Sequence, residues 1–358
     1  MKVYIRSSAC ISPQKTFGNA DILSEVMEYN DTRLRAIEPD YSAYIDPKLI
    51  RRMSHIIKMG VAAARECLTR GNVEMPGAII TGTAFGCLED TVSFLTRMIE
   101  MQEEMLPPTA FIQSTHNTVA AQVALMLKCH NYNNTFVHKG ISFESALLDG
   151  MMLLKEKEAD NVLVGGTDEL TDASYAVLSR LGLYRRQPIS NLSLFTTEAK
   201  GTIGGEGAVF VLLSGKQSED NLAELNGLHT FYKSKDAVEI EQQINAFLER
   251  NGLKIEDIDL VITGRNGDIR NDEVYHQLSR SLFKDTVMAN YKHLCGEYPT
   301  SPAFALWLAA NVVSVDANTG GYVQAWTLER AGNRAPKKVL IYNHYLNIYH
   351  SLMLVSAC

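Results

Sequence analysis

The chain has 358 residues, of which 46% are hydrophobic and 21% are charged, a balance that excludes a fibrous or largely disordered protein. Its formal net charge of -7 disfavours nucleic-acid binding, because phosphate contacts need clustered Lys and Arg side chains. A small-molecule site or a protein partner is compatible with this charge. The length fits two domains, or one large α/β domain with a duplicated core.

Strand-like and helix-like segments alternate along the whole chain, which predicts an α/β fold. In the first part of the chain, strands are expected at residues 2–5, 77–83, 134–138, 161–166 and 207–213. Helices are expected between them at residues 47–70, 90–105, 119–128 and about 142–157.

The polar, charged stretch 214–224 is predicted to be a linker, after which the pattern restarts. Helices are expected beyond it at residues 236–251, 271–283 and 303–315, and strands at 259–263, 322–328 and 338–342. We therefore predict two α/β halves, residues 1–215 and 216–358.

The cysteines are scattered, and the start of the chain alternates like a strand instead of carrying the apolar core of a secretion signal. We therefore expect reduced thiols and a cytoplasmic protein. Residues 303–315, the most apolar stretch, are fewer than the ~20 that a membrane span requires, so we expect a buried helix and no membrane partner. The six cysteines are Cys10, Cys67, Cys87, Cys129, Cys295 and Cys358.

Three local patterns are similar to known sites, but each lacks a residue or a neighbouring element that the site requires. The glycine cluster 201–207 is followed by an apolar strand, whereas a dinucleotide loop must lead into a helix. Cys129 and His130 have no second pair at ligand spacing, so we expect no metal. Residues 140–144 resemble a nucleophile elbow without its final glycine, and Ser142 is expected to cap the next helix. We expect no cofactor.

Read in order, several segments resemble those of β-ketoacyl-acyl-carrier-protein synthases. Residues 106–127 resemble the segment before the nucleophile, and 159–166 resemble a strand that ends in two glycines. Residues 201–207 resemble a Gly-Glu-Gly turn, and 256–261 resemble the run that leads to the first catalytic histidine. The family positions retained by this resemblance are Glu206, Lys292 and Gly296. The resemblance implies a thiolase-like fold, with two related α/β halves in an αβαβα arrangement.

The three catalytic positions depart from that family. Its members use a cysteine thiolate to take the acyl chain, and two histidines to assist decarboxylation of a malonyl thioester. Counting back from the double-glycine strand places the nucleophile at Gly140. The stretch 264–272, where the first histidine is expected, contains Arg265 and no histidine, and the second position holds Glu297.

The resemblance therefore implies a non-condensing subunit of the chain-length-factor type, which pairs with an intact ketosynthase, meets an acyl carrier protein and shapes the acyl cavity. We expect dimerisation through the strand 134–138, as a heterodimer or, in isolation, a homodimer. The residues expected to line the acyl cavity are Phe111, Ile112, Met126 and Phe143.

Two alternatives stay open. The first is an active acyltransferase or synthase with relocated groups, such as Ser142 acting with His138 or Glu297. The second is a binding or scaffold protein for an acyl carrier protein.

Overall fold

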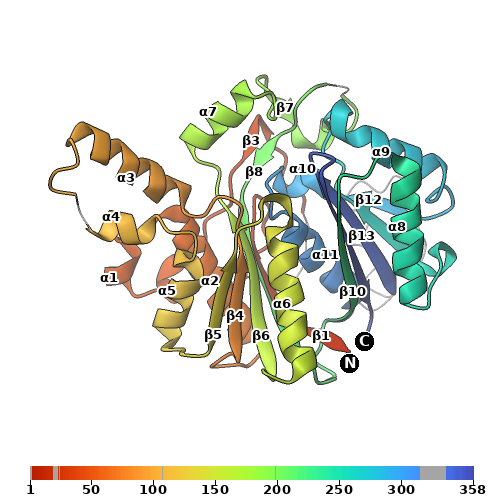
Figure 1. Ribbon diagram of the computed structural model, residues 1–358, viewed down its shortest axis with the longest axis horizontal. Helices are drawn as coiled ribbons and strands as arrows, with labels where there is room; N and C mark the ends of the chain where they lie inside the picture. Colours follow the sequence, from red (N-terminus) through yellow and green to blue (C-terminus); the bar gives the residue numbers. More distant parts are fainter. Residues whose placement is uncertain (1, 19–22, 24, 107, 198, 315–335) are drawn as a thin grey trace.

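One ten-stranded sheet runs through the molecule (Figure 1). The computed structural model describes residues 2–18, 23, 25–106, 108–197, 199–314 and 336–358. The earlier strands of this sheet are β1 (Val3–Ile11), β4 (Ala78–Gly82), β5 (Tyr132–Phe136), β6 (Asn161–Asp168) and β9 (Gly207–Ser214). The later strands are β10 (Ala223–Tyr232), β11 (Leu260–Thr263), β12 (Met288–Asn290), β13 (Lys338–Tyr345) and β14 (Tyr349–Ser356).

The two groups of strands repeat one spatial order. The sheet runs β12-β11-β13-β14-β10-β1-β9-β6-β4-β5. If the five strands of each group are numbered in chain order, both groups have the spatial order 3-2-4-5-1 from the outer edge of the sheet to its middle. The two groups meet where β1 pairs antiparallel with β10. This repeat is what an internal duplication produces. The predicted division at residue 215 falls between β9 and β10 and stays a prediction.

Helices complete a five-layer arrangement, α on β on α on β on α (Figure 1). Helices α2 and α5 cover one outer face, α6 and α11 lie between the two parts of the sheet, and α8 and α9 cover the other outer face. The predicted αβαβα architecture is therefore confirmed. The helix bounds are α1 (Pro47–Ile50), α2 (His55–Arg70), α3 (Leu88–Glu100), α4 (Pro108–Gln113), α5 (Thr118–Leu127), α6 (Ser142–Glu156), α7 (Asp172–Arg180), α8 (Ala237–Arg250), α9 (Ile269–Arg280), α10 (Lys292–Cys295) and α11 (Pro302–Ser314).

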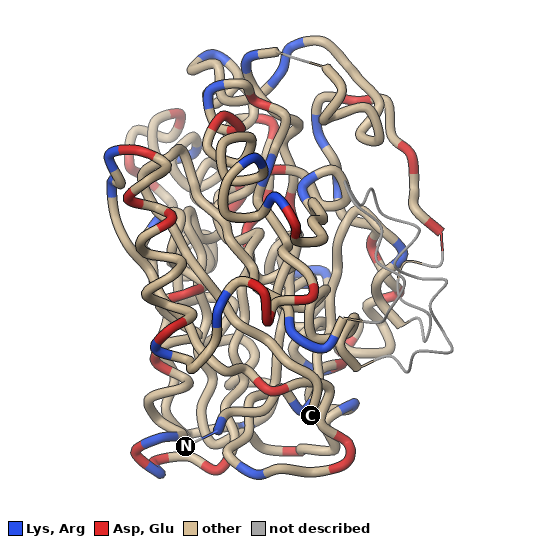
Figure 2. The backbone as a smooth tube through the Cα atoms, turned by 90° about the vertical axis from the view of Figure 1, so that its right-hand side faces the viewer, with Lys and Arg blue, Asp and Glu red and all other residues tan. Residues whose placement is uncertain are grey.

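Helix α11 confirms the expected buried helix, because its side chains from Pro302 to Val313 are all buried in the central layer. Among the described residues, no helix combines the length and the apolar character that crossing a bilayer needs. Figure 2 shows basic and acidic residues interspersed along the chain on this side of the molecule. All six cysteines lie in the described part of the chain and are unpaired.

Several predicted elements need correction. The expected helix 47–70 is two helices, because the chain leaves the helical path after Arg51 and Met53 packs into the outer core before α2 starts. The sequence interpretation missed β10, β12, β14 and α7, as well as the short pairs β2 (Asn30–Asp31) with β7 (Ile189–Ser190) and β3 (Arg33–Leu34) with β8 (Gly204–Gly205). The strand expected at 322–328 lies outside the described residues.

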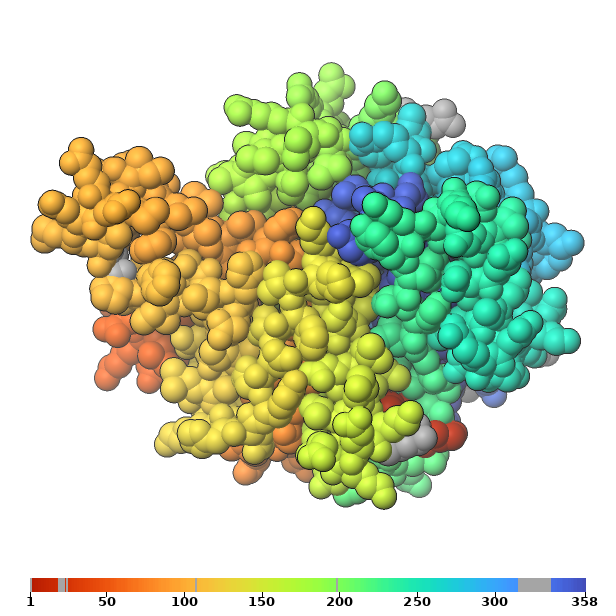
Figure 3. All heavy atoms as spheres, viewed as in Figure 1, coloured from red at the N-terminus to blue at the C-terminus, as the bar shows by residue number. Residues whose placement is uncertain are grey.

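Helices α3 and α4 form an arm that projects from the body of the molecule (Figure 3). Large apolar side chains are exposed along this arm, although most side chains of this kind are buried in a monomer. An exposed group of this kind is typical of a surface that another protein covers. The members with the largest exposure are Ile99, Met105, Phe111 and Ile112.

Candidate functional site

The turn between β5 and α6 carries the position expected for a nucleophile. Lys139 adopts a left-handed conformation with φ 48°, and Gly140 is buried in the short 3-10 turn that follows β5. The Ser142 hydroxyl accepts a hydrogen bond from the backbone N–H of His138 at 2.8 Å and donates to the carbonyl of Lys139 at 2.8 Å. Ser142 therefore fastens this turn.

This geometry corrects the expected capping role of Ser142. The N-cap position of α6 is Ile141, which supplies no side-chain hydrogen bond, and Ser142 is the first residue of the helix. The link between His138 and Ser142 runs through backbone, while the His138 imidazole lies edge-on to the Tyr349 ring at 6.3 Å between centroids. The Ser142 proton is committed to a carbonyl, so the geometry does not favour Ser142 as a nucleophile.

Tyr345, at the end of β13, occupies the space into which a side chain at position 140 would project. A Cβ atom on Gly140 would lie 2.8 Å from Tyr345 Cγ and 2.9 Å from Tyr345 Cδ1. Carbon atoms do not approach so closely, so a cysteine fits at position 140 only if Tyr345 moves. Burial raises the pKa of Tyr345, which keeps its hydroxyl un-ionised.

The position expected for the second histidine holds a buried ion pair. Glu297 Oε1 lies 2.7 Å from Lys292 Nζ, and Glu297 Oε2 accepts a hydrogen bond from the Asn266 side-chain amide at 2.7 Å. Lys292 also donates to the Ser301 hydroxyl. The two side chains of the pair are only 1% and 8% exposed. Each oxygen of the Glu297 carboxylate therefore has a hydrogen-bond donor.

In the stretch 264–272, where the first histidine is expected, the residue that contacts Glu297 is Asn266 and not Arg265. The Arg265 guanidinium faces Asp272 at 3.3 Å, donates to the Phe195 carbonyl and lies over the Phe195 ring. The sequence interpretation therefore chose a neighbour of the residue that contacts Glu297. It also missed Tyr345, which lies in a stretch where no family motif can be identified.

The retained family positions hold segments together. Glu206 is buried and accepts hydrogen bonds from the backbone N–H groups of Ala36 and Leu170, both at 3.0 Å. Gly296 has φ 75°, and a Cβ there would lie 2.5 Å from the Gly205 Cα. Both positions therefore have structural requirements that do not depend on catalysis.

The residues proposed for an acyl cavity do not meet within one chain. Phe111 and Ile112 are 58% and 60% exposed on the arm, and Met126 packs against the outer core beside α2. Phe143 is fully buried in the central layer. Their role in a cavity stays a prediction.

Comparison with known proteins identifies the family of this chain. The family model described as the N-terminal domain of β-ketoacyl synthases matches residues 30–242, more than half of the chain. The chain therefore belongs to the β-ketoacyl synthase family. No curated protein sequence gives a significant match.

Solved structures of ketosynthases share the fold over the whole chain. The ishigamide ketosynthase/chain length factor is 16% identical with a TM-score of 0.81, covering 100% of this chain and 99% of that one. A β-ketoacyl synthase from Burkholderia phymatum is 15% identical, with a TM-score of 0.79 and the same coverage. A ketosynthase in complex with its chain length factor from Xenorhabdus doucetiae is 15% identical with a TM-score of 0.79, covering 100% of this chain and 98% of that one. The fold is thus thiolase-like.

Proposed function

We propose that this protein is a non-condensing subunit of the chain-length-factor type, which pairs with an active ketosynthase and shapes the space for the growing acyl chain. The observation that carries the proposal is the contact between Gly140 and Tyr345. Position 140 has no nucleophile, and the tyrosine leaves no room for one. A covalent acyl intermediate therefore has no place to form there.

The charge at the centre supports the same proposal. Decarboxylative condensation develops negative charge on an enolate oxygen, and synthases stabilise that charge with hydrogen-bond donors. Here the buried Glu297 carboxylate occupies the corresponding region, where it would repel such an oxygen, and the donors of Lys292 and Asn266 are already bonded to it.

Two features of the surface support a partner subunit. Strand β5 forms one outer edge of the sheet, so the residues on its open side can pair with a strand of another chain. The arm of α3 and α4 exposes apolar side chains. Two similar structures are described as pairing a ketosynthase with a chain length factor, and another includes an acyl-carrier protein with its ketosynthase. An intact ketosynthase and an acyl carrier protein are the partners that we propose.

The alternative of an active synthase with relocated groups has less support. Its candidate nucleophile, the Ser142 hydroxyl, is held by two backbone groups, and Glu297 is held by Lys292 and Asn266.

Co-expression with a candidate partner ketosynthase, followed by incubation with an acyl-carrier-protein thioester, tests the proposal. We expect the two chains to purify together, and intact-mass measurement to find the acyl adduct on the ketosynthase only. A stable adduct on this chain, at Ser142 or at any cysteine, would establish the relocated-catalysis alternative instead. A ketosynthase that makes products of unchanged length with and without this chain would rule out the chain-length role.

A further inference from the structure

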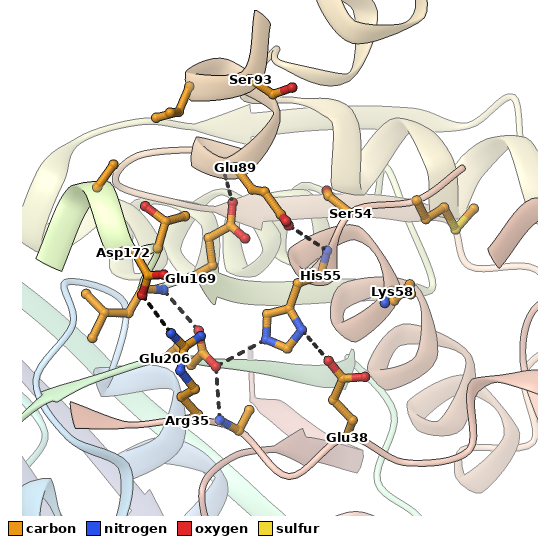
Figure 4. A pocket seen from close by; sticks show the side chains of 16 residues that line it. Arg35, Glu38, Ser54, His55, Lys58, Glu89, Ser93, Glu169, Asp172 and Glu206 are labelled. Carbon is orange, nitrogen blue, oxygen red and sulfur yellow. Dashed lines mark hydrogen bonds and ion pairs between the residues drawn. The ribbon is translucent and has the colours of Figure 1, made fainter. Parts of the chain in front are cut away.

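Both ring nitrogens of the buried His344 bond to backbone groups. The ring of His55, in an open cleft at the start of α2, instead lies between two carboxylates (Figure 4). His344 Nε2 lies 3.0 Å from the Asn271 carbonyl oxygen, and His344 Nδ1 lies 3.2 Å from the Asn347 backbone nitrogen. His344 therefore connects α9, which contains Asn271, to the turn that joins β13 to β14.

One neutral tautomer of His344 satisfies both bonds. A carbonyl oxygen only accepts hydrogen bonds, so Nε2 carries the proton, and the unprotonated Nδ1 accepts the Asn347 N–H. Burial lowers the pKa of His344 to about 3, so the ring stays neutral near pH 7. The ring also stacks on Tyr275 of α9, with 4.8 Å between centroids and 12° between the ring planes. These contacts fix the imidazole from the side of α9.

The turn 346–348 needs such support, because it holds two side chains in the left-handed region. Leu346 has φ 58° and Asn347 has φ 53°. Leucine disfavours this region, because its Cβ then lies too close to the following carbonyl oxygen. The Asn347 side-chain amide donates to the Arg270 carbonyl of α9 at 2.9 Å, and its backbone N–H donates to His344. Asn347 therefore ties the turn to α9 both directly and through His344.

The position of the Tyr345 ring depends on the backbone of this turn. Tyr345 stands between His344 and Leu346, and its ring fills the space next to Gly140. In the part of the chain that the structure describes, no hydrogen bond holds the Tyr345 hydroxyl. Figure 3 shows the end of the β13–β14 hairpin, in dark blue, beside the yellow segment that follows β5. The ring is therefore placed by packing and by the backbone on either side of it.

We propose that His344 and Asn347 are positioning residues that keep the elbow, residues 138–141, covered: they hold the turn against α9 and thereby keep the Tyr345 ring over Gly140. This inference rests on the proposed function, because an elbow that stays covered cannot receive an acyl chain. An acyl adduct at the elbow would overturn the proposed function, whereas amide hydrogen exchange reports the position of the turn without any acyl group.

Amide hydrogen exchange of the full chain, followed by mass spectrometry of its peptides, tests the proposal. His344→Phe keeps an aromatic ring against Tyr275 and removes both hydrogen bonds. We expect exchange at residues 138–141 to become at least ten-fold faster than in the native chain. Asn347→Ala removes an exposed bond to Arg270, so its fold should persist, and it should speed exchange at the elbow at least three-fold.

A Tyr345→Ala background shows whether the effect passes through Tyr345. That variant should itself uncover the elbow, and adding His344→Phe should then cause no further rise in exchange at residues 138–141. The matched control is His229→Phe, which removes the bond of another histidine to Gln243 and leaves the turn unchanged. It should leave exchange at the elbow at the native rate.

Native exchange at the elbow in folded His344→Phe or Asn347→Ala would overturn the proposal. The same holds if His344→Phe speeds exchange equally with and without Tyr345, or if exchange in α5 rises as much as at the elbow, since either result would indicate general destabilisation. If His344→Phe does not fold, Asn347→Ala decides the question with the same Tyr345→Ala comparison.

Discussion

Lys292 Nζ lies 2.7 Å from Glu297 Oε1 in a position where both side chains are almost completely buried. Two buried charges are tolerated because each satisfies the other, and the Ser301 hydroxyl and the Asn266 amide take up their remaining hydrogen-bonding capacity. Removal of one partner alone leaves an uncompensated charge in the interior. The pair therefore makes this buried centre sensitive to single substitutions.

Lys292→Met should lower the free energy of unfolding by about 3–5 kcal/mol, because Glu297 then stays buried without its counter-ion. The double variant Lys292→Met/Glu297→Gln should recover part of this loss, since it removes both charges. Urea denaturation measures both values. The control Lys284→Met removes an exposed ammonium and should change stability by less than about 0.5 kcal/mol. A Lys292→Met variant as stable as the native protein would show that the pair is unimportant.

Gly140→Cys should not create a reactive thiol, because Tyr345 fills the space around position 140. We expect this variant to lose about 1–3 kcal/mol of stability through overpacking. Adding Tyr345→Ala should recover much of that loss and allow iodoacetamide to modify the new thiol. The experiment needs a Cys358→Ser background, because Cys358 is exposed whereas the other native cysteines are buried. Rapid labelling of Gly140→Cys with Tyr345 intact would contradict this account of the site.

The contact between Gly140 and Tyr345 could not be predicted from the sequence. Tyr345 reaches the elbow because β13 and β14 form a hairpin, and the turn between them places Leu346 and Asn347 at φ 58° and 53°. Two-residue turns with positive φ can normally be predicted from Asn-Gly or Gly-Gly pairs in the sequence. A leucine at such a position gives no signal, so neither β14 nor the approach of Tyr345 could be predicted.

The layered fold was more accessible than the site. The architecture could be predicted from the alternating strand and helix patterns and from the family segments. This is possible because the hydrophobic periodicity of a strand or helix depends only on residues close together in the sequence. The choice between Arg265 and Asn266 depended on which of two adjacent side chains turns inward after β11. A shift of one residue exchanges an inward for an outward side chain, and only the three-dimensional contacts to Glu297 and Asp272 decide it.

Thr135→Pro should prevent β5 from pairing with a partner strand. The Phe136 carbonyl accepts a hydrogen bond from the Thr83 N–H, so the backbone groups of Phe136 face β4 and those of Thr135 face the open edge. The Thr135 N–H donates to the Asn134 side-chain oxygen at 2.9 Å in the single chain and has to exchange that bond for a partner strand. A proline at position 135 removes this edge donor without breaking the β4–β5 ladder. We expect light scattering to report a monomer, alone or mixed with the ketosynthase.

Thr135→Val is the control for that experiment. It removes the hydroxyl contact with Thr81 but keeps the backbone N–H, so the assembly should be retained. A Thr135→Pro variant that still assembles would exclude this edge as the interface. A proline at Phe136 is less informative, because it would disturb the ladder inside the subunit.

Glu144→Gln should change how stability depends on pH. Glu144 is fully buried beneath the elbow, and neither of its carboxyl oxygens has a hydrogen-bond partner among the described residues. Burial raises the pKa of Glu144 to about 7, and the nearby Ser351 hydroxyl and Lys292 ammonium offset only part of that effect. The folded state thus holds a proton that the unfolded chain releases at its ordinary pKa near 4.5.

This difference in proton binding means that ionisation of Glu144 destabilises the folded state as the pH rises. Below pH 4.5 the carboxyl is protonated in both states and has no effect, between pH 4.5 and 7 its effect grows as the pH rises, and above pH 7 the folded state bears the full cost of a buried charge. That cost is about 3 kcal/mol. Urea denaturation should therefore find Glu144→Gln near native stability at pH 4.5 and more stable than the native protein by up to about 3 kcal/mol at pH 8. Glu249→Gln should track the native protein at both values, and a constant difference between Glu144→Gln and native protein across this range would disprove the assignment.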